Sequence, residues 1–239
     1  MKKLIFCNQK NYLKTKDVEH FMEVMKEHNS DRLVIFPIMP FLLKYQENGF
    51  NVGSQNTAPY NIKAITGEVN ASQLKDMGIK YALVGHSERR KYCKEDNKQI
   101  SRKLKLLIKR GIVPILCVGE TSNDYDEGIT SAAIKRQLDE ALIDIDELST
   151  KELMIAYEPV WAIGTGKTPT NAEILKVIAF IRKELKDRYK DYFKILYGGS
   201  VNDSNIENLN KIDMLDGYLM GSFATKAEDL ITILEKTKK

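Results

Sequence analysis

A carboxylate and a glycine-rich loop are adjacent in the stretch AYEPVWAIGTGKT, residues 156–168. Glu158 directly follows the apolar run Leu153–Tyr157, which is typical of a strand. The end of a strand is a rigid support of the kind that a proton-abstracting base needs. The following segment, 162–166, contains two glycines and no charge before Lys167. Its backbone changes conformation at little cost and presents bare N–H groups, which suits a lid that closes over an anion. This combination predicts an enzyme.

Two other apolar runs end in residues that could act together with this carboxylate. Lys10 follows Leu4–Asn8, where its ammonium group could hold a negative group, although this pattern alone favours a solvated loop lysine. His86 follows Tyr81–Val84, and Ser87 and Glu88 after it could open a helical turn. The positive end of a helix dipole disfavours imidazolium, so this histidine would be neutral. A structural histidine that caps the turn is the alternative. Arg90 and Lys91 are expected on a solvated basic surface.

Two glycine turns indicate a phosphate site. Tyr197-Gly198-Gly199-Ser200 and Met220-Gly221-Ser222 each follow a short apolar run. A plain turn would have the same sequence, but two such turns after the last two strands of a barrel match its usual phosphate site. One base, one imidazole, one ammonium and a phosphate cradle suit proton transfer next to a carbonyl on a small phosphorylated substrate.

The elements that must position these residues are short apolar strands alternating with helical patterns. Helices are expected over Asp17–Glu27, Glu95–Arg110, 170–187 and Ala227–Lys236. Eight strand–helix units over residues 1–239 favour a single α/β domain, a (β/α)8 TIM barrel, over an open doubly wound sheet. The expected strands are Leu4–Asn8, Leu33–Phe36, Asn51–Gln55, Tyr81–Val84, Ile112–Val118, Leu153–Tyr157, Phe193–Tyr197 and Gly217–Met220. The third is the weakest, because it has little apolar character.

Composition narrows the class of protein. The chain has 43% hydrophobic and 29% charged residues and a net charge of +4 without a basic tract, which disfavours nucleic-acid binding and suits an anionic substrate. Its apolar runs are too short for a signal peptide or a membrane span. Three widely spaced cysteines fit a reducing compartment, so a cytoplasmic protein is expected. One histidine among the strand ends makes a metal site improbable, and GTGKT lacks the earlier glycine of a nucleotide loop.

The chain resembles the triosephosphate isomerase family over its whole length. The resemblance lies in long motifs that are rare elsewhere. They are Asn8-x-Lys10, GHSERR at 85–90, CVGE at 117–120, AYEPVWAIGTGKT at 156–168, YGGS at 197–200, and Asp216-Gly217 with Gly221.

The resemblance implies a homodimer without a cofactor that interconverts dihydroxyacetone phosphate and glyceraldehyde 3-phosphate. Glu158 would be the base and His86 the neutral electrophile, while Lys10 and Asn8 would bind substrate and stabilise the enediolate. Glu88 would support Lys10, and Thr66 would lie in a loop that reaches the neighbouring subunit. The backbone N–H groups of Gly164, Ser200, Gly221 and Ser222 would hold the phosphate, and Tyr197 with Ser200 would latch the closed lid. That lid would comprise Pro159, Val160, Trp161, Ala162, Ile163, Gly164, Thr165, Gly166, Lys167 and Thr168.

The chain departs from the family pattern at a few positions. Gln9 stands where tryptophan is usual and Cys7 where glycine is usual, so altered stability is expected rather than lost activity. Ser222 stands where a second glycine is usual and would add strain if that backbone needed a positive φ. A barrel aldolase or lyase is the alternative enzyme, although the sixth strand offers glutamate in place of a Schiff-base lysine. A catalytically silent binding barrel is the alternative outside enzymes.

Overall fold

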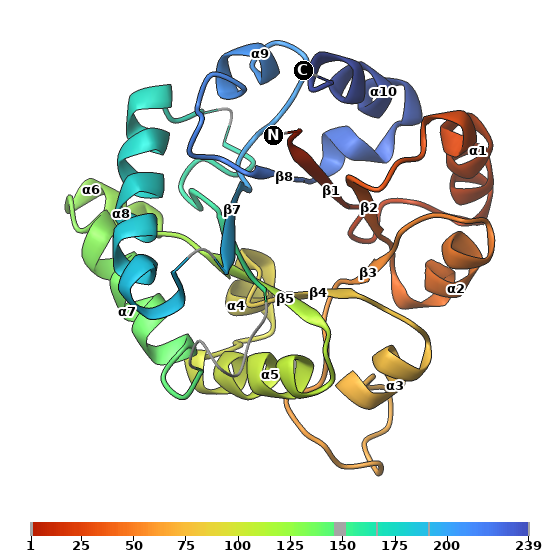
Figure 1. The fold of residues 1–239 in the computed structure, drawn as a ribbon, viewed down its shortest axis with the longest axis horizontal. Coiled ribbons are helices and arrows are strands. Elements are labelled where there is room, and N and C mark those ends of the chain that lie inside the picture. The colour runs from red at the N-terminus through yellow and green to blue at the C-terminus, as the bar shows by residue number, and fades with distance from the viewer. Residues whose placement is uncertain (1, 146–151, 166, 191, 239) are drawn as a thin grey trace.

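The computed structural model of the chain describes residues 2–145, 152–165, 167–190 and 192–238, and these form a nearly closed barrel of eight parallel strands (Figure 1). Neighbouring strands pair in the order β2-β1-β8-β7-β6-β5-β4-β3. A bridge between Ile35 and Val52 brings the two ends of this order together. The strands are β1 (Leu4–Asn8), β2 (Leu33–Phe36), β3 (Gly53–Ser54), β4 (Tyr81–Val84), β5 (Val113–Val118), β6 (Leu153–Tyr157), β7 (Phe193–Tyr197) and β8 (Gly217–Met220).

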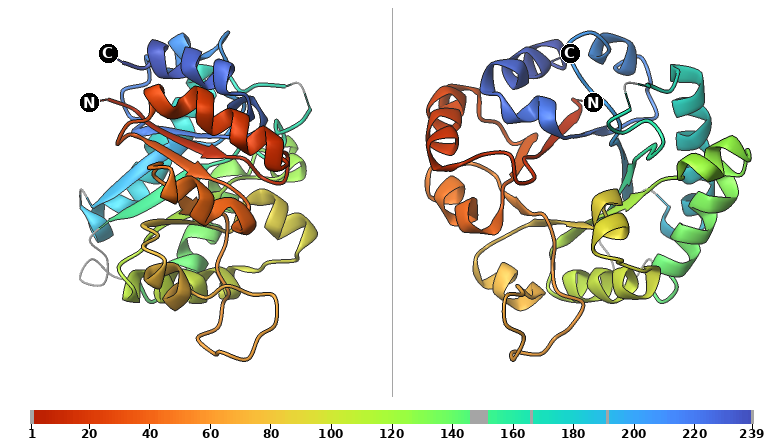
Figure 2. Two further views of the ribbon diagram at one scale, coloured as in Figure 1. Left: turned by 90° about the vertical axis from the view of Figure 1, so that its right-hand side faces the viewer. Right: turned by 180° about the vertical axis from the view of Figure 1, so that it is seen from behind.

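Helices surround the barrel, as the two views in Figure 2 show. They are α1 (Thr15–Met25), η1 (Lys26–His28), α2 (Met39–Glu47), α3 (Ala71–Asp76), α4 (Ser87–Tyr92), α5 (Asn97–Lys109), α6 (Ser122–Asp126), α7 (Thr130–Ala141), α8 (Asn171–Tyr189), α9 (Ile206–Leu209), η2 (Ser222–Thr225) and α10 (Ala227–Lys236). Eight parallel strands with helices around them confirm the predicted (β/α)8 barrel. None of the helices in the described residues is both long and apolar enough to cross a membrane.

The strand predictions hold with one substantial correction. The third strand, expected over Asn51–Gln55, is only Gly53–Ser54. Gly53 is required there, because a Cβ atom at this position would lie 2.2 Å from the ring of Phe36. The small residues that weakened the apolar signal therefore make room for a large inward-facing side chain. The ends of the four predicted helices differ from the observed ones by two residues or fewer, and Ala227–Lys236 agrees at both ends.

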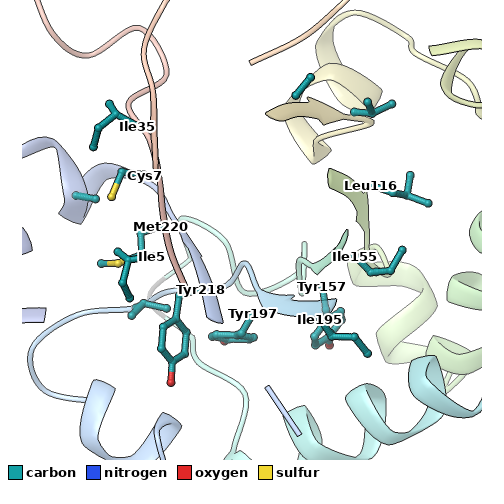
Figure 3. Packing of buried hydrophobic residues seen from close by; sticks show 14 of the residues in the cluster. Ile5, Cys7, Ile35, Leu116, Ile155, Tyr157, Ile195, Tyr197, Tyr218 and Met220 are labelled. Atoms are coloured by element: carbon teal, nitrogen blue, oxygen red, sulfur yellow. The ribbon is translucent and has the colours of Figure 1, made fainter. Parts of the chain in front are cut away.

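Two apolar layers hold the barrel together, one inside it and one between strands and helices. Side chains alternate along each strand, so every second residue faces the axis. The inner cluster includes Phe6, Phe36 and Met154, all fully buried. The outer cluster includes the neighbouring strand residues Ile5, Cys7, Ile155, Tyr157 and Tyr197, shown in Figure 3. The alternation decides which residues reach the mouth of the barrel.

Candidate active site

One cavity opens at the C-terminal ends of the strands, and the inward rows of side chains lead into it. Leu4 and Phe6 face the barrel axis, so Asn8 continues their row to the mouth. Met154 and Ala156 face inward likewise, and Glu158 continues theirs. The cavity has a volume of about 130 Å³. It is lined by Asn8, Lys10, His86, Glu158, Ile163, Gly164, Gly198, Gly199, Ser200, Val201, Leu219, Met220, Gly221, Ser222 and Phe223.

Glu158 lies at the inner wall of this cavity and is 2% exposed. Its Oε1 is 2.9 Å from Nε2 of His86, and its Oε2 accepts a 2.9 Å hydrogen bond from the backbone N–H of Ser87. Burial would raise the pKa of Glu158, but His86 and the Ser87 N–H outweigh it and lower that pKa. The carboxyl group is therefore ionised at neutral pH, which is the form a proton acceptor requires.

His86 is the N-cap residue of α4, as the sequence predicted when it placed a helical turn after this histidine. Its Nδ1 accepts the backbone N–H of Glu88 at 3.3 Å, so this nitrogen keeps its lone pair and the proton resides on Nε2. Burial disfavours the imidazolium form, whereas the Glu158 carboxylate favours it, and the balance raises the pKa of His86, which is opposite to the direction expected from the helix dipole alone. A carbonyl oxygen that replaced Glu158 at Nε2 would remove the largest influence favouring the cation.

The coupling between these two side chains predicts a measurable pKa change. In Glu158→Gln, the pKa of His86 is expected to fall below its wild-type value, because burial remains after the carboxylate is lost. An NMR titration of the histidine ring protons measures this directly. His20 and His28 lie outside the cavity lining and serve as controls in the same spectra. A pKa of His86 that is equal in both proteins would contradict the coupling.

Lys10 reaches the cavity from an unusual backbone conformation. Its φ of +48° lies in the left-handed region, which costs a residue with a side chain about 1–2 kcal/mol. The Lys10 N–H donates to Asn8 Oδ1 at 3.1 Å, and Gln55 Nε2 donates to the Lys10 carbonyl at 3.0 Å. Lys10 Nζ donates to Glu88 Oε1 at 2.5 Å, which agrees with the supporting position expected for Glu88. The surroundings thus hold the ammonium group at the mouth despite the strained backbone.

Two glycines make the space that Glu158 occupies. A Cβ atom on Gly119 would lie 1.7 Å from the carbonyl oxygen of Glu158, and one on Gly198 would lie 2.9 Å from its Cγ. The first contact would displace the backbone at the end of β6. Gly119 and Gly198 therefore set the position of the carboxylate from the ends of β5 and β7.

The segment expected to form a lid begins in a series of turns beside the cavity. Pro159 and Val160 accept backbone hydrogen bonds from Ala162 and Ile163, at 2.9 and 3.3 Å. Ile163 and Gly164 line the cavity, and Gly164 has a φ of +74°. Thr165, Lys167 and Thr168 are exposed, whereas Gly166 lies outside the described residues.

The two glycine turns and the lid segment meet at the same cavity. Its lining includes Gly164, Ser200, Gly221 and Ser222. Ser222 opens η2 and is not among the positive-φ residues of the described chain, so the strain expected at this position is absent. Tyr197 lies outside the cavity lining, and its buried hydroxyl group has no hydrogen-bond partner among the described residues.

Arg90 does not lie on a solvated surface as expected. Its guanidinium group donates to the carbonyl oxygens of Gly85 at 2.8 Å and Cys117 at 3.2 Å, and to Asn97 Oδ1 at 2.6 Å. It therefore joins the ends of β4 and β5 beneath the site. Lys91 is exposed, as predicted.

Sequence reasoning also missed several residues that hold the site. Ser87 and Gly119 lay within quoted motifs, but nothing in the sequence indicated their contacts with Glu158. Gln55 lies just beyond the short β3 and donates to both Lys10 and Phe36 carbonyls. Glu120, buried at the end of β5, accepts hydrogen bonds from Tyr157 at 3.1 Å and Trp161 Nε1 at 2.7 Å. Such partners become visible only when segments far apart in the chain are brought together.

Comparisons with known proteins agree with this architecture. The family model described as triosephosphate isomerase matches residues 3–237. A triosephosphate isomerase of Clostridium tetani is 38% identical over 91% of this chain and 88% of its own length. Proteins of the same name from Malacoplasma penetrans and Mycoplasmoides gallisepticum are each 37% identical over 98% of both chains. With the family model matched almost from end to end, this chain belongs to the triosephosphate isomerase family.

Proposed function

We propose that this protein interconverts dihydroxyacetone phosphate and D-glyceraldehyde 3-phosphate by proton transfer through an enediolate. The observation that carries the proposal is the convergence of an ionised Glu158, an imidazole with its proton on Nε2, and the ammonium group of Lys10 on one cavity. A carboxylate, a hydrogen-bond donor and a cation are the three groups that such a reaction needs.

The chemistry follows from where these groups lie. Glu158 removes a proton from C1 of the ketose, the C1–H electrons form the C1–C2 double bond, and negative charge develops on O2. His86 donates its Nε2–H to O2, and Lys10 stabilises the developing charge. The hydroxyl proton on O1 must then leave while the new proton stays on O2. His86, which has given its Nε2–H to O2, is the group placed to take the proton from O1, and this restores its own Nε2–H. Glu158 returns its proton to C2, which gives the aldose.

The phosphate group would bind among the backbone N–H groups of Ser200, Gly221 and Ser222. These turns expose donors at the same mouth, and Gly164 of the lid segment lies on the same cavity. Closure of residues 159–168 would exclude water and keep the enediolate from expelling its phosphate. Tyr197 and Ser200 are the proposed latch, and Asn8 is a further substrate contact.

A homodimer is the proposed assembly, in a cytoplasmic setting. Residues 55–70 form a loop that projects from the body of the barrel between β3 and α3, shown in orange in Figures 1 and 2. Thr66 is exposed on it, and Tyr60 and Ile62 expose 42% and 57% of their surface. Exposed apolar side chains on a projecting loop support burial against a second copy.

A coupled assay with purified protein tests the activity. Isomerisation in both directions without added cofactor is the expected result, and gel filtration across a dilution series tests the dimer. Absence of isomerisation would overturn the proposal and favour the silent binding barrel. Covalent trapping of substrate by borohydride would favour a Schiff-base aldolase instead.

A further inference from the structure

Tyr125 lies on α6 and contacts one residue near the start of the lid segment and one in the helix that follows its end. Its ring stacks on the ring of Trp161, with centroids 4.0 Å apart and an angle of 22° between the ring planes. Its hydroxyl group donates a 3.0 Å hydrogen bond to Oε1 of Glu173. Trp161 is the third residue of the lid segment, and Glu173 lies in the first turn of α8, the helix that follows it. Figure 1 shows α6 beside α8.

The two residues that Tyr125 contacts are each held by further hydrogen bonds as well. Trp161 Nε1 donates to the buried Glu120 at 2.7 Å, so the indole is held by a hydrogen bond at its edge and by Tyr125 on its face. Glu173 Oε2 accepts hydrogen bonds from both the N–H and the hydroxyl group of Thr170, two residues after the segment ends. The tyrosine thus connects two anchored points on either side of the lid tip.

We propose that Tyr125 is a positioning residue for the lid: together with Trp161 and Glu173 it forms an aromatic clasp that fixes the separation of the two lid ends. With both ends held, movement is confined to the tip that includes Ile163 and Gly164. The closing tip then meets the phosphate in one orientation. This inference rests on the proposed function, because the lid closes on the substrate of that reaction.

The size of the effect follows from the strength of the stack. A favourable aromatic pair changes an equilibrium constant roughly 2- to 12-fold. Loss of the clasp is therefore expected to shift the closed state of the lid by a factor in this range. Because an incompletely closed lid admits water to the enediolate, the release of inorganic phosphate per isomerisation event rises by a similar factor.

Tyr125→Ala removes the clasp, and Trp161 reports the result because it is the only tryptophan in the chain. Its fluorescence anisotropy is expected to fall and its emission to shift to the red, as the indole gains freedom and contact with water. The affinity for 2-phosphoglycolate, a carboxylate that mimics the enediolate, should fall roughly 2- to 12-fold. Phosphate release per isomerisation should rise to match.

Two further variants separate the stacking contact from the hydrogen bond and provide a control. Tyr125→Phe keeps the stack and loses only the hydrogen bond to Glu173, so its anisotropy should match wild type while its phosphate release is intermediate. Tyr192→Ala removes another exposed tyrosine, 49% exposed, at the N-terminal end of β7 and should change neither readout. Melting temperatures of all three show whether the barrel is intact.

The fluorescence readout separates failure of the clasp from failure of the proposed function. Wild-type anisotropy, inhibitor affinity and phosphate release in Tyr125→Ala would overturn the clasp and leave the isomerase proposal standing. A wild-type protein without isomerase activity would overturn the function, and the anisotropy measurement would still test whether Tyr125 restrains Trp161. Equal changes in Tyr125→Ala and Tyr192→Ala would also overturn the clasp.

Discussion

Glu158→Asp is expected to lower kcat by about 100-fold while KM changes less than about threefold. Aspartate keeps the charge but withdraws the carboxylate by one methylene group. The hydrogen bond from Ser87 N–H at 2.9 Å and the contact with His86 at 2.9 Å both depend on the longer side chain. The carboxylate therefore loses its alignment with the substrate carbon, although the turns proposed to bind the phosphate are unchanged.

Steady-state kinetics in both directions measure this effect, with Glu23→Asp as the matched control. Glu23 is exposed on α1 and lies outside the cavity lining, so its shortening should leave kcat at the wild-type value. A Glu158→Asp protein with wild-type kcat would show that another group is the base. A large rise in KM alone would instead make Glu158 a substrate-binding residue.

The residues proposed to perform the chemistry could be predicted because they follow strands in the sequence. In a parallel barrel each strand end reaches the same mouth, so Asn8, His86 and Glu158 meet although 150 residues separate the first from the last. The two-residue alternation along β1 and β6 also decides that Asn8 and Glu158 face inward. Local sequence is sufficient for both inferences.

The groups that hold those residues in place could not be predicted in the same way. Arginine is a residue type usually found at the surface, yet Arg90 donates hydrogen bonds to the carbonyl groups of Gly85 and Cys117 at the ends of two strands. Gly119 is needed because of the Glu158 carbonyl oxygen, 39 residues later in the chain. Tyr125 contacts the lid across a similar interval. Each role depends on a contact between separate segments, for which one sequence contains no local pattern.

Lys10→Met is expected to reduce kcat/KM by about 1,000-fold. Methionine keeps an unbranched side chain of similar length, so the cost of the +48° φ is nearly the same and the fold should be retained. The ammonium group, which is proposed to stabilise a charge that grows during the reaction, is lost. Both kcat and the affinity for a phosphorylated substrate should fall, whereas Lys98→Met, an exposed change on α5, should alter neither.

The partner of Lys10 makes this prediction more specific. Lys10 Nζ is 2.5 Å from Glu88 Oε1, so Lys10→Met leaves the Glu88 carboxylate unpaired beside the cavity that is proposed to bind an anionic substrate. Part of the loss in affinity is then repulsion by Glu88, and the double variant Lys10→Met/Glu88→Gln should recover KM by about tenfold or less. It should not recover kcat, because the stabilising cation is still missing. Recovery of kcat in the double variant would mean that Lys10 acts only by neutralising Glu88, and that the enediolate is stabilised by His86 alone.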